Sequence, residues 1–155
     1  MAPSSIPWTV TAPRVADRSA LAGESPVAAA LGRCRPLFRR SVLVVAPAEC
    51  GGLEAVRVAS EQGARVTALC AAEQAVSARA AGAEVILDPE RTDPTWYRGA
   101  WSVIVDPNGE IGFRRAMASL APDGVYVTAS ARPSDRARAL LARVSGGPRL
   151  LSSKG

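Results

Sequence analysis

The sequence predicts an α/β fold built on a mostly parallel sheet. Five short apolar runs rich in β-branched residues recur along the chain, and stretches with the apolar spacing of amphipathic helices separate them. The runs do not alternate apolar and polar residues, which is typical of strands that helices cover on both faces. A third observation is the loop at 46–52, which consists largely of small residues and joins the first run to a helix.

We expect residues 1–24 to form a flexible arm and residues 25–155 to form one domain. The arm is rich in Pro, Ser and Ala without a repeat. The first helix is expected to begin after Ser25, whose side chain can act as the N-cap, with Pro26 at the first helical position. Pro36 ends this helix.

The next three elements form a strand–helix–strand unit. Residues 41–46 are a compact β-branched run and predict the first strand. After the small-residue loop, apolar residues such as Val56 and Ala59 recur at helical spacing, and Gly63 stands where a helix C-cap belongs. The second strand then covers 64–70 and runs parallel to the first, because a helix connects them.

The pattern repeats along the rest of the chain. In order, we expect a helix at 73–83 that ends at Gly82, strands at 84–88 and 101–106, a helix at 112–121, a turn at 122–124 and a strand at 125–130. These elements predict a Rossmann-like, doubly wound sheet of five to six strands with helices on both faces. In such sheets ligands bind outside the carboxyl ends of the strands. Those ends are the loops that start at Ala46, Cys70, Asp88, Asp106 and Ser130.

Composition limits the classes of protein to consider. A chain of 155 residues that is 48% hydrophobic can bury one proper core. The net charge is +5, but the arginines concentrate towards the two ends and are not interleaved with aromatic residues, so nucleic acid is not expected as a partner. No stretch predicts a membrane span or a signal peptide, and the expected location is the cytoplasm.

The chain has three cysteines and no histidine. The cysteines lack the spacing of metal ligands, so no metal site is expected. The absence of histidine excludes Ser-His-Asp and Cys-His arrangements. Any acid–base chemistry must therefore come from carboxylates, tyrosine, cysteine or a cofactor.

Four segments, in this order and spacing, resemble the nucleotide-binding domain of medium-chain dehydrogenases/reductases, especially the zinc-free quinone-oxidoreductase branch. They are AVRVASEQGARVTA (55–68), AAGAEVILD (80–88), SVIVDPNG (102–109) and LAPDGVYV (120–127). The resemblance extends from Val27 to about Ser130.

The resemblance implies a domain that binds NADPH or NADH and passes hydride to a quinone or an activated alkene. It also implies a separate N-terminal catalytic domain, longer than the segment before Val27, and a closing strand and helix after residue 155. The chain would then be a truncated or excised domain, or one half of a split enzyme. A companion catalytic subunit is an expected partner, together with a small organic substrate.

The loop that would hold the pyrophosphate departs from the family's glycine pattern. Gly52 keeps the glycine that allows close packing of helix on strand, and Gly51 stands where a small apolar residue is usual. Cys50 and Glu49 replace glycines, and Ala46 replaces the first one. The residues that would line the cofactor site are Ala46, Ala48, Cys50, Gly51, Gly52, Ala71, Asp106 and Ser130.

Glu49 raises the question of whether this loop still holds a dinucleotide. The N-terminus of a helix attracts an anion, and Glu49 can be that anion. A carboxylate about 4 Å from a phosphate charge repels it by roughly 1 kcal/mol in bulk water and by about 4 kcal/mol at an effective dielectric near 20. We therefore expect binding of NADPH or NADH to be weak or lost. The residues after the second strand, among them Ala71 and Glu73, favour neither cofactor over the other. Alternatively, Glu49 turns to solvent or caps its own helix.

Two other functions remain open. In the first, the former cofactor crevice binds an organic ligand, or promotes an isomerisation or cyclisation with Glu49 and Asp106 as catalytic residues. Asp106 is alternatively a turn-forming residue, and Cys50 a candidate nucleophile. In the second, the uncovered edge of the fifth strand pairs with a second copy or another partner as a non-catalytic scaffold. The aromatic residues of 96–101 are expected to fill core or to border an apolar pocket.

Overall fold

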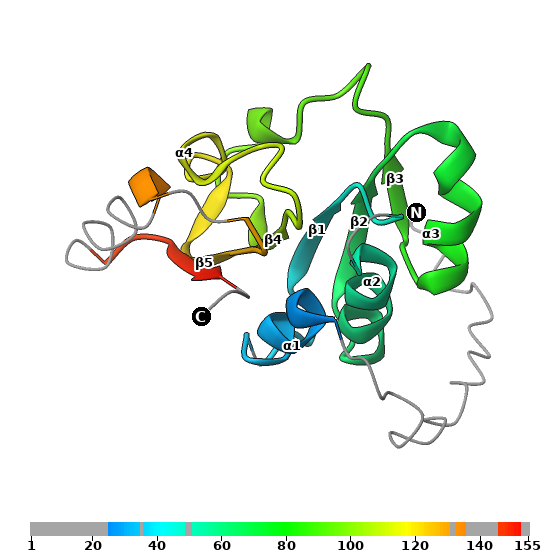
Figure 1. Cartoon of the computed structure of the whole chain (residues 1–155), viewed down its shortest axis with the longest axis horizontal. Coiled ribbons are helices and arrows are strands. Elements are labelled where there is room, and N and C mark those ends of the chain that lie inside the picture. The colour runs from blue at the N-terminus through cyan, green and yellow to red at the C-terminus, as the bar shows by residue number, and fades with distance from the viewer. Residues whose placement is uncertain (1–24, 35, 49–50, 131–132, 136–145, 153–155) are drawn as a thin grey trace, which may run out of the picture.

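The computed structural model describes residues 25–34, 36–48, 51–130, 133–135 and 146–152. Six strands form one sheet in the order β3-β2-β1-β4-β5-β6, and every neighbouring pair is parallel (Figure 1). The predicted doubly wound α/β fold is confirmed, whereas the arm expected at 1–24 lies outside the described residues. The strands are β1 (Ser41–Val45), β2 (Arg65–Leu69), β3 (Val85–Leu87), β4 (Trp101–Val105), β5 (Leu120–Thr128) and β6 (Arg149–Ser152).

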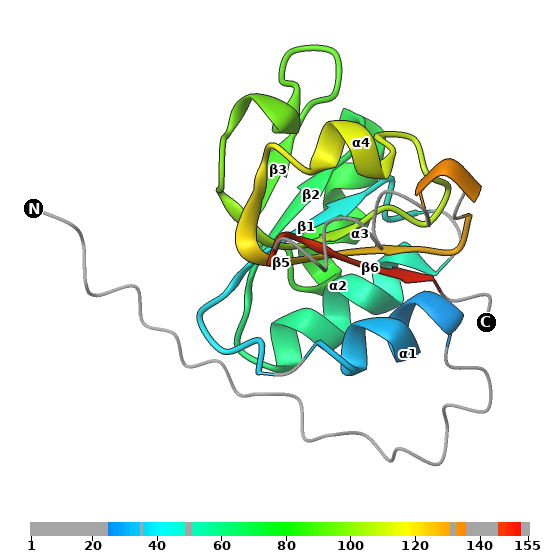
Figure 2. The ribbon, with the colours of Figure 1, turned by 90° about the vertical axis from the view of Figure 1, so that its left-hand side faces the viewer.

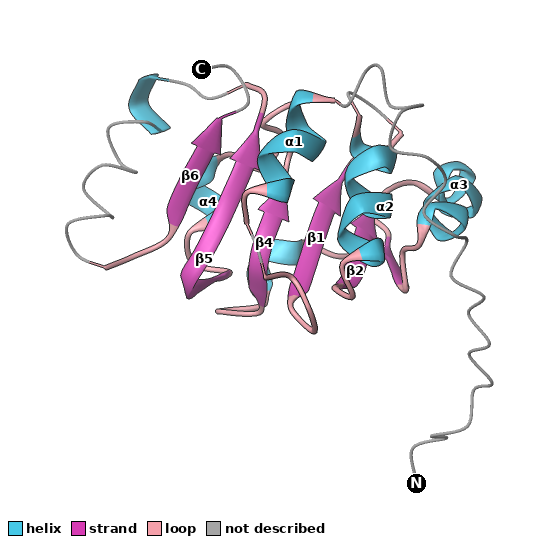
Figure 3. Ribbon diagram, turned by 90° about the horizontal axis from the view of Figure 1, so that it is seen from below, coloured by secondary structure: helices cyan, strands magenta, loops and turns pink. Residues whose placement is uncertain are grey.

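Helices cover both faces of the sheet. Helices α1 and α2 lie side by side on one face, and α4 lies on the other (Figures 2 and 3). Helix α3 packs beside α2. The bounds are α1 (Pro26–Gly32), α2 (Gly52–Glu61), α3 (Ala75–Ala81) and α4 (Phe113–Ala116), with short 3₁₀ helices η2 (Ala72–Gln74) and η3 (Pro94–Trp96).

The central strand β1 shows why its sequence is apolar without alternation. Val42 and Val44 pack into the core below α1 and α2, while Leu43 and Val45 pack into the core on the α4 face. All four side chains are buried. Each such side chain contributes about 1.5–3 kcal/mol through burial, so both cores depend on this strand.

Three predicted helix ends, at Ser25, Gly63 and Gly82, are found where the sequence places them. The Ser25 hydroxyl accepts a hydrogen bond from the Ala28 amide at 3.2 Å, with Pro26 at the first helical position. Gly82 caps the C-terminus of α3 with φ 118°, and Gly63 follows α2 with φ 77°. Both glycines adopt the left-handed conformation that ends a helix.

Two predictions for the second half of the chain are wrong. The helix expected at 112–121 ends at Ala116, and β5 begins at Leu120, where burial against the sheet overrides the helical spacing. The expected turn at 122–124 lies inside β5 as a bulge. Trp101 pairs with Leu120 but Val103 pairs with Val125, so extra residues of β5 loop out there.

The edge beside β5 also differs from the expectation. A closing strand was expected only after residue 155, which would leave the edge of β5 uncovered. Instead, β6 pairs with β5 from Val125–Arg149 to Thr128–Ser152. The strand contains only Leu150 and Leu151 as apolar residues, which is too short an apolar run to predict a strand.

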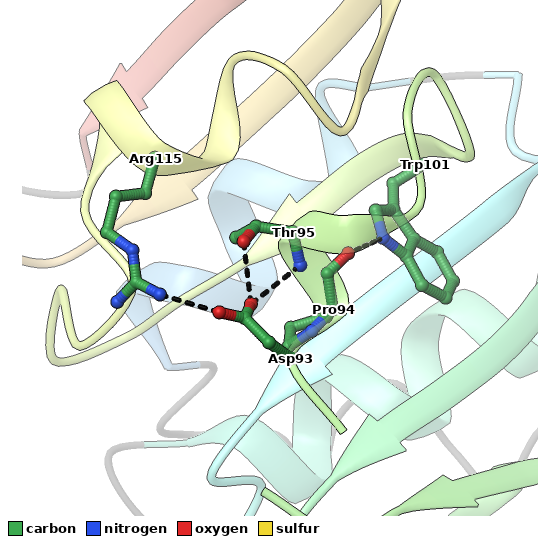
Figure 4. A network of polar contacts seen from close by, with 5 residues as sticks. All are labelled: Asp93, Pro94, Thr95, Trp101 and Arg115. Atoms are coloured by element: carbon green, nitrogen blue, oxygen red, sulfur yellow. Dashed lines mark hydrogen bonds and ion pairs between the residues drawn. The ribbon is translucent and has the colours of Figure 1, made fainter. Parts of the chain in front are cut away.

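A polar network fastens the long connection between β3 and β4 to α4 (Figure 4). The Asp93 carboxylate accepts hydrogen bonds from the amide and hydroxyl of Thr95, at 2.9 and 2.6 Å, and from Arg115 at 2.7 Å. The Trp101 indole donates to the Pro94 carbonyl at 3.1 Å. The hydrogen bonds from Thr95, followed by the charge of Arg115, hold the pKa of Asp93 below its usual value.

The aromatic residues of this connection have different environments. Trp101 is buried, as expected for a core residue. Trp96 is 71% exposed and Tyr97 is 47% exposed, so the expectation that they fill core is wrong. The ring of Tyr97 lies edge-on to that of Trp101, with the ring centroids 6.4 Å apart.

Candidate functional site

Those predicted site residues that the structure describes gather at the carboxyl edge of the sheet, around the ends of β1 and β4. These strands are neighbours, with Val44 opposite Val105. From β1 the chain continues towards β2 and β3, and from β4 it continues towards β5 and β6. The strand order therefore reverses between β1 and β4, which is the point where doubly wound folds bind their ligands.

Ala46 begins the loop that leaves β1, and its backbone is in the left-handed region with φ 44°. Its amide donates to the Leu69 carbonyl at 2.9 Å, which fixes the residue beside the end of β2. A non-glycine residue in this conformation costs about 1–2 kcal/mol. The chain thus keeps, with alanine, a backbone geometry that suits glycine.

Two glycines connect this loop to α2. Gly51 is the N-cap with φ 80°, and no side chain among the described residues caps the helix there. Gly52 is buried, and a Cβ at this position would lie 2.6 Å from the Pro47 Cα and 2.7 Å from its carbonyl oxygen. The helix therefore approaches the loop at a distance that only glycine allows, as the sequence predicted for Gly52. Ala48 is exposed in the same turn.

A carboxylate that the sequence analysis missed lies at this helix terminus. Glu54, in the first turn of α2, accepts a hydrogen bond from the Ser25 amide at 2.8 Å. The start of α1 is thereby held against the start of α2, and a side chain at position 51 would collide with Ser25. The available signal was a Glu three residues after an N-cap. The predicted site residues Glu49 and Cys50 lie outside the described residues.

Asp106 directly follows β4 and is fully buried. Its carboxylate accepts hydrogen bonds from the amides of Glu110 and Ile111, both at 2.8 Å, and of Gly112 at 3.3 Å. The Tyr126 hydroxyl donates to the same carboxylate at 2.7 Å. Asp106 therefore holds the loop that leads into α4.

These contacts favour the turn-forming interpretation of Asp106 over a catalytic one. Both carboxylate oxygens already accept hydrogen bonds from neighbours in the fold. Burial, followed by the charge of Asp106, raises the pKa of the Tyr126 phenol far above its usual value. The phenol therefore remains a neutral donor to the carboxylate at physiological pH.

The remaining predicted residues border the same edge. Ala71 follows β2 and starts η2. The Ser130 amide donates to the Thr128 hydroxyl at 3.0 Å, and the Ser130 carbonyl lies 3.4 Å from where a Cβ on Gly109 would be, so the loops after β4 and β5 touch. Cys70 is buried, and burial followed by the charge of Glu73 raises the pKa of its thiol, which makes it a poor nucleophile.

The described part of the chain contains no cluster of three or more His, Cys, Asp or Glu side chains that could hold a metal ion. Within the same residues, no helix has the length and apolar character needed to cross a membrane.

No protein-family model and no curated protein sequence matches the chain. Solved structures do match it. A quinone oxidoreductase from Coxiella burnetii superposes with a TM-score of 0.69 at 18% identity, over 84% of this chain and 42% of its own. A cobalt- and zinc-bound alcohol dehydrogenase from Pyrobaculum aerophilum gives 0.64 at 22% identity, over 84% and 39%. A mycobacterial protein in complex with NADPH gives 0.60 at 27% identity, over 82% and 44%.

These matches confirm, at the level of the fold, the expected resemblance to quinone oxidoreductases and other medium-chain dehydrogenases/reductases. The chain spans about two fifths of the length of the solved structures it matches.

Proposed function

We propose that the chain binds a nicotinamide dinucleotide, NADPH or NADH, at the switch point between β1 and β4, with an affinity that acidic residues at the loop reduce. The observation that carries the proposal is the backbone of the β1–α2 loop. Ala46 is left-handed, Gly51 leaves the N-terminus of α2 without a side-chain cap, and Gly52 allows the close approach to Pro47. These are the features a phosphate-binding turn requires.

In this proposal the first amides of α2 would hold the pyrophosphate, and the loops after β4 and β5 would border the other half of the ligand. A bound dinucleotide supplies a hydride to a reducible substrate. The chain's part is to bind and orient it. The substrate pocket would come from a companion catalytic subunit or domain.

The reduced affinity follows from charge at the helix N-terminus. Glu54 lies in the first turn of α2, and Glu49 precedes the N-cap Gly51 by two positions in the sequence. A carboxylate at about 4 Å from a phosphate costs roughly 1–4 kcal/mol. That cost corresponds to a loss of about tenfold to a thousandfold in affinity.

The alternative of a cofactor-independent isomerase or cyclase has less support. It needs Asp106 as an acid or base, but that carboxylate is buried and accepts hydrogen bonds from three amides and Tyr126.

Isothermal titration with NADPH and NADH tests the proposal on four proteins: the parent, Glu49→Gly, Glu54→Gln and the control Glu61→Gln. Glu61 is the last residue of α2, so its substitution removes the same charge at the far end of the helix. We expect weak binding by the parent and the control, and at least about tenfold tighter binding by Glu49→Gly or Glu54→Gln.

Two results would contradict it. Micromolar binding by the parent would show that the acidic residues do not weaken the site. No binding by the parent or any variant would show that this edge no longer binds a dinucleotide.

A further inference from the structure

A hollow lies at the amino edge of the sheet, opposite the candidate site, on the face that α1 covers. It is a groove of about 300 Å³ between the C-terminal end of α1 and strands β4, β5 and β6. None of the residues predicted to line the cofactor site borders it. The groove is large enough for a small organic molecule.

The floor of the groove is apolar. Val103 pairs with Val125 on the next strand, so the two side chains lie in one row on the same face of the sheet. Both pack with the core on the α1 face, together with Leu151 of β6. Val103 is already buried, whereas Val125 and Leu151 are partly exposed, so a ligand with an apolar body can bury the remaining surface of these two side chains.

The row of valines ends at an arginine. Val125 pairs with Arg149 on β6, and Arg149 is exposed at the groove. A core-facing position of the sheet thus carries a guanidinium group, whose methylene stem can lie on the apolar floor while its charged end stays in solvent.

The rim of the groove carries a positive charge. Arg33, at the end of α1, and Arg40, just before β1, line it with Arg149, and the only carboxylate among its described lining residues is Asp123. Arg40 donates to Asp123 at 2.9 Å, and the charge of Arg149 also acts on that carboxylate, so the three arginines outnumber the one carboxylate and the rim stays positive. The Cys34 thiol also borders the groove, but burial raises its pKa to about 11, so it does not offer a thiolate.

From this combination of apolar floor and guanidinium rim, we infer that the groove binds a small organic anion with an apolar body, such as a medium-chain carboxylate. The carboxylate would pair with Arg33 and Arg149, and the apolar body would lie over Val103, Val125 and Leu151. This binding is independent of the dinucleotide, because it uses the other edge of the sheet.

Titration of the full chain with octanoate and with 1-octanol tests the inference, because the two probes share an apolar chain and differ in charge. We expect octanoate to bind with a dissociation constant of about 0.1–1 mM, and octanol at least tenfold more weakly. Arg149→Gln and Arg33→Gln should each weaken octanoate binding severalfold. Arg91→Gln serves as the control, because Arg91 is exposed and pairs with Asp88 outside the groove.

Three results would overturn the inference. They are absence of octanoate binding to the parent, equal binding of octanoate and octanol, and octanoate binding that neither Arg33→Gln nor Arg149→Gln weakens. Inorganic phosphate is a further probe, and phosphate binding as tight as that of octanoate would show that the apolar floor takes no part. Arg33 is exposed at a helix end, so Arg33→Gln keeps the test valid if Arg149→Gln does not fold.

Discussion

The substitution Gly52→Ala tests whether the contact between α2 and the loop after β1 limits the stability of the fold. The added Cβ would lie 2.6–2.9 Å from backbone atoms of Pro47, where ordinary contact begins at 3.4 Å. Pro47 is buried, so the helix or the loop must shift. Overpacking of this kind costs about 1–3 kcal/mol, whereas alanine gains up to about 1 kcal/mol in helix propensity. We expect a net loss of about 1–2 kcal/mol.

The matched control is Gly32→Ala in α1. The same methyl group would have no atom within 4 Å there, so the change should leave stability unchanged or raise it by up to about 1 kcal/mol. Urea unfolding followed by circular dichroism gives both free energies. The loss at position 52 should lower the melting temperature by about 2–8 °C. If the two variants unfold at the same urea concentration, the close approach at Gly52 does not carry the packing role assigned to it.

Three further predictions concern stability. Ala46→Gly removes about 1–2 kcal/mol of backbone strain and adds about 0.4–1 kcal/mol of unfolded-state entropy, so its urea midpoint should stay the same or rise; a clear fall would contradict the left-handed geometry. Tyr126→Phe should lower the free energy of unfolding by about 1–2 kcal/mol. Asp106→Asn should lower it by more, because the amide group of asparagine would place a donor against the loop amides, which are donors themselves. Negligible losses in both variants would refute the role of Asp106 in holding the loop. The pKa of Asp93 is lowered from 3.8 in the folded chain, so its stabilisation is present above that value and lost as the pH falls through the folded pKa. In thermal melts at a series of acid pH values, the melting temperature of Asp93→Asn should therefore fall less steeply with falling pH than that of the parent. An equal slope in the two proteins would contradict this.

The first half of the fold could be predicted because local signals and burial agree there. In β1 and β2 the β-branched runs coincide with strands that are buried on both faces. Ser25, Gly63 and Gly82 mark helix ends by their own conformational preferences. In such segments each residue type indicates the same structure as the tertiary contacts do.

The second half was harder because tertiary contacts decide it. The helical spacing of 112–121 is real, but Leu120 gains more from pairing in the sheet than from continuing α4. Strand β6 has no local signal that distinguishes it from a loop, and its pairing with β5 defines it. Sequence spacing does not report such long-range contacts.

The candidate site could be located but not fully described from the sequence. The loops at the carboxyl edge follow from the order of strands and helices, and Gly52 was assigned its packing role from its place in the loop. The hydrogen bond from Ser25 to Glu54 joins residues 29 positions apart, and that from Tyr126 to Asp106 joins residues 20 apart. No local pattern predicts these pairs.

The position of each strand in the sheet has a consequence for amide hydrogen exchange. Strands β1 and β4 have partners on both sides, whereas β3 and β6 are the two outermost strands of the described sheet. The amides of β3 and β6 should exchange through local openings, while those of β1 should exchange only when the whole domain unfolds. The proposed dinucleotide site would then border the slowest-exchanging strands, and the groove beside β6 would border a strand that opens more often.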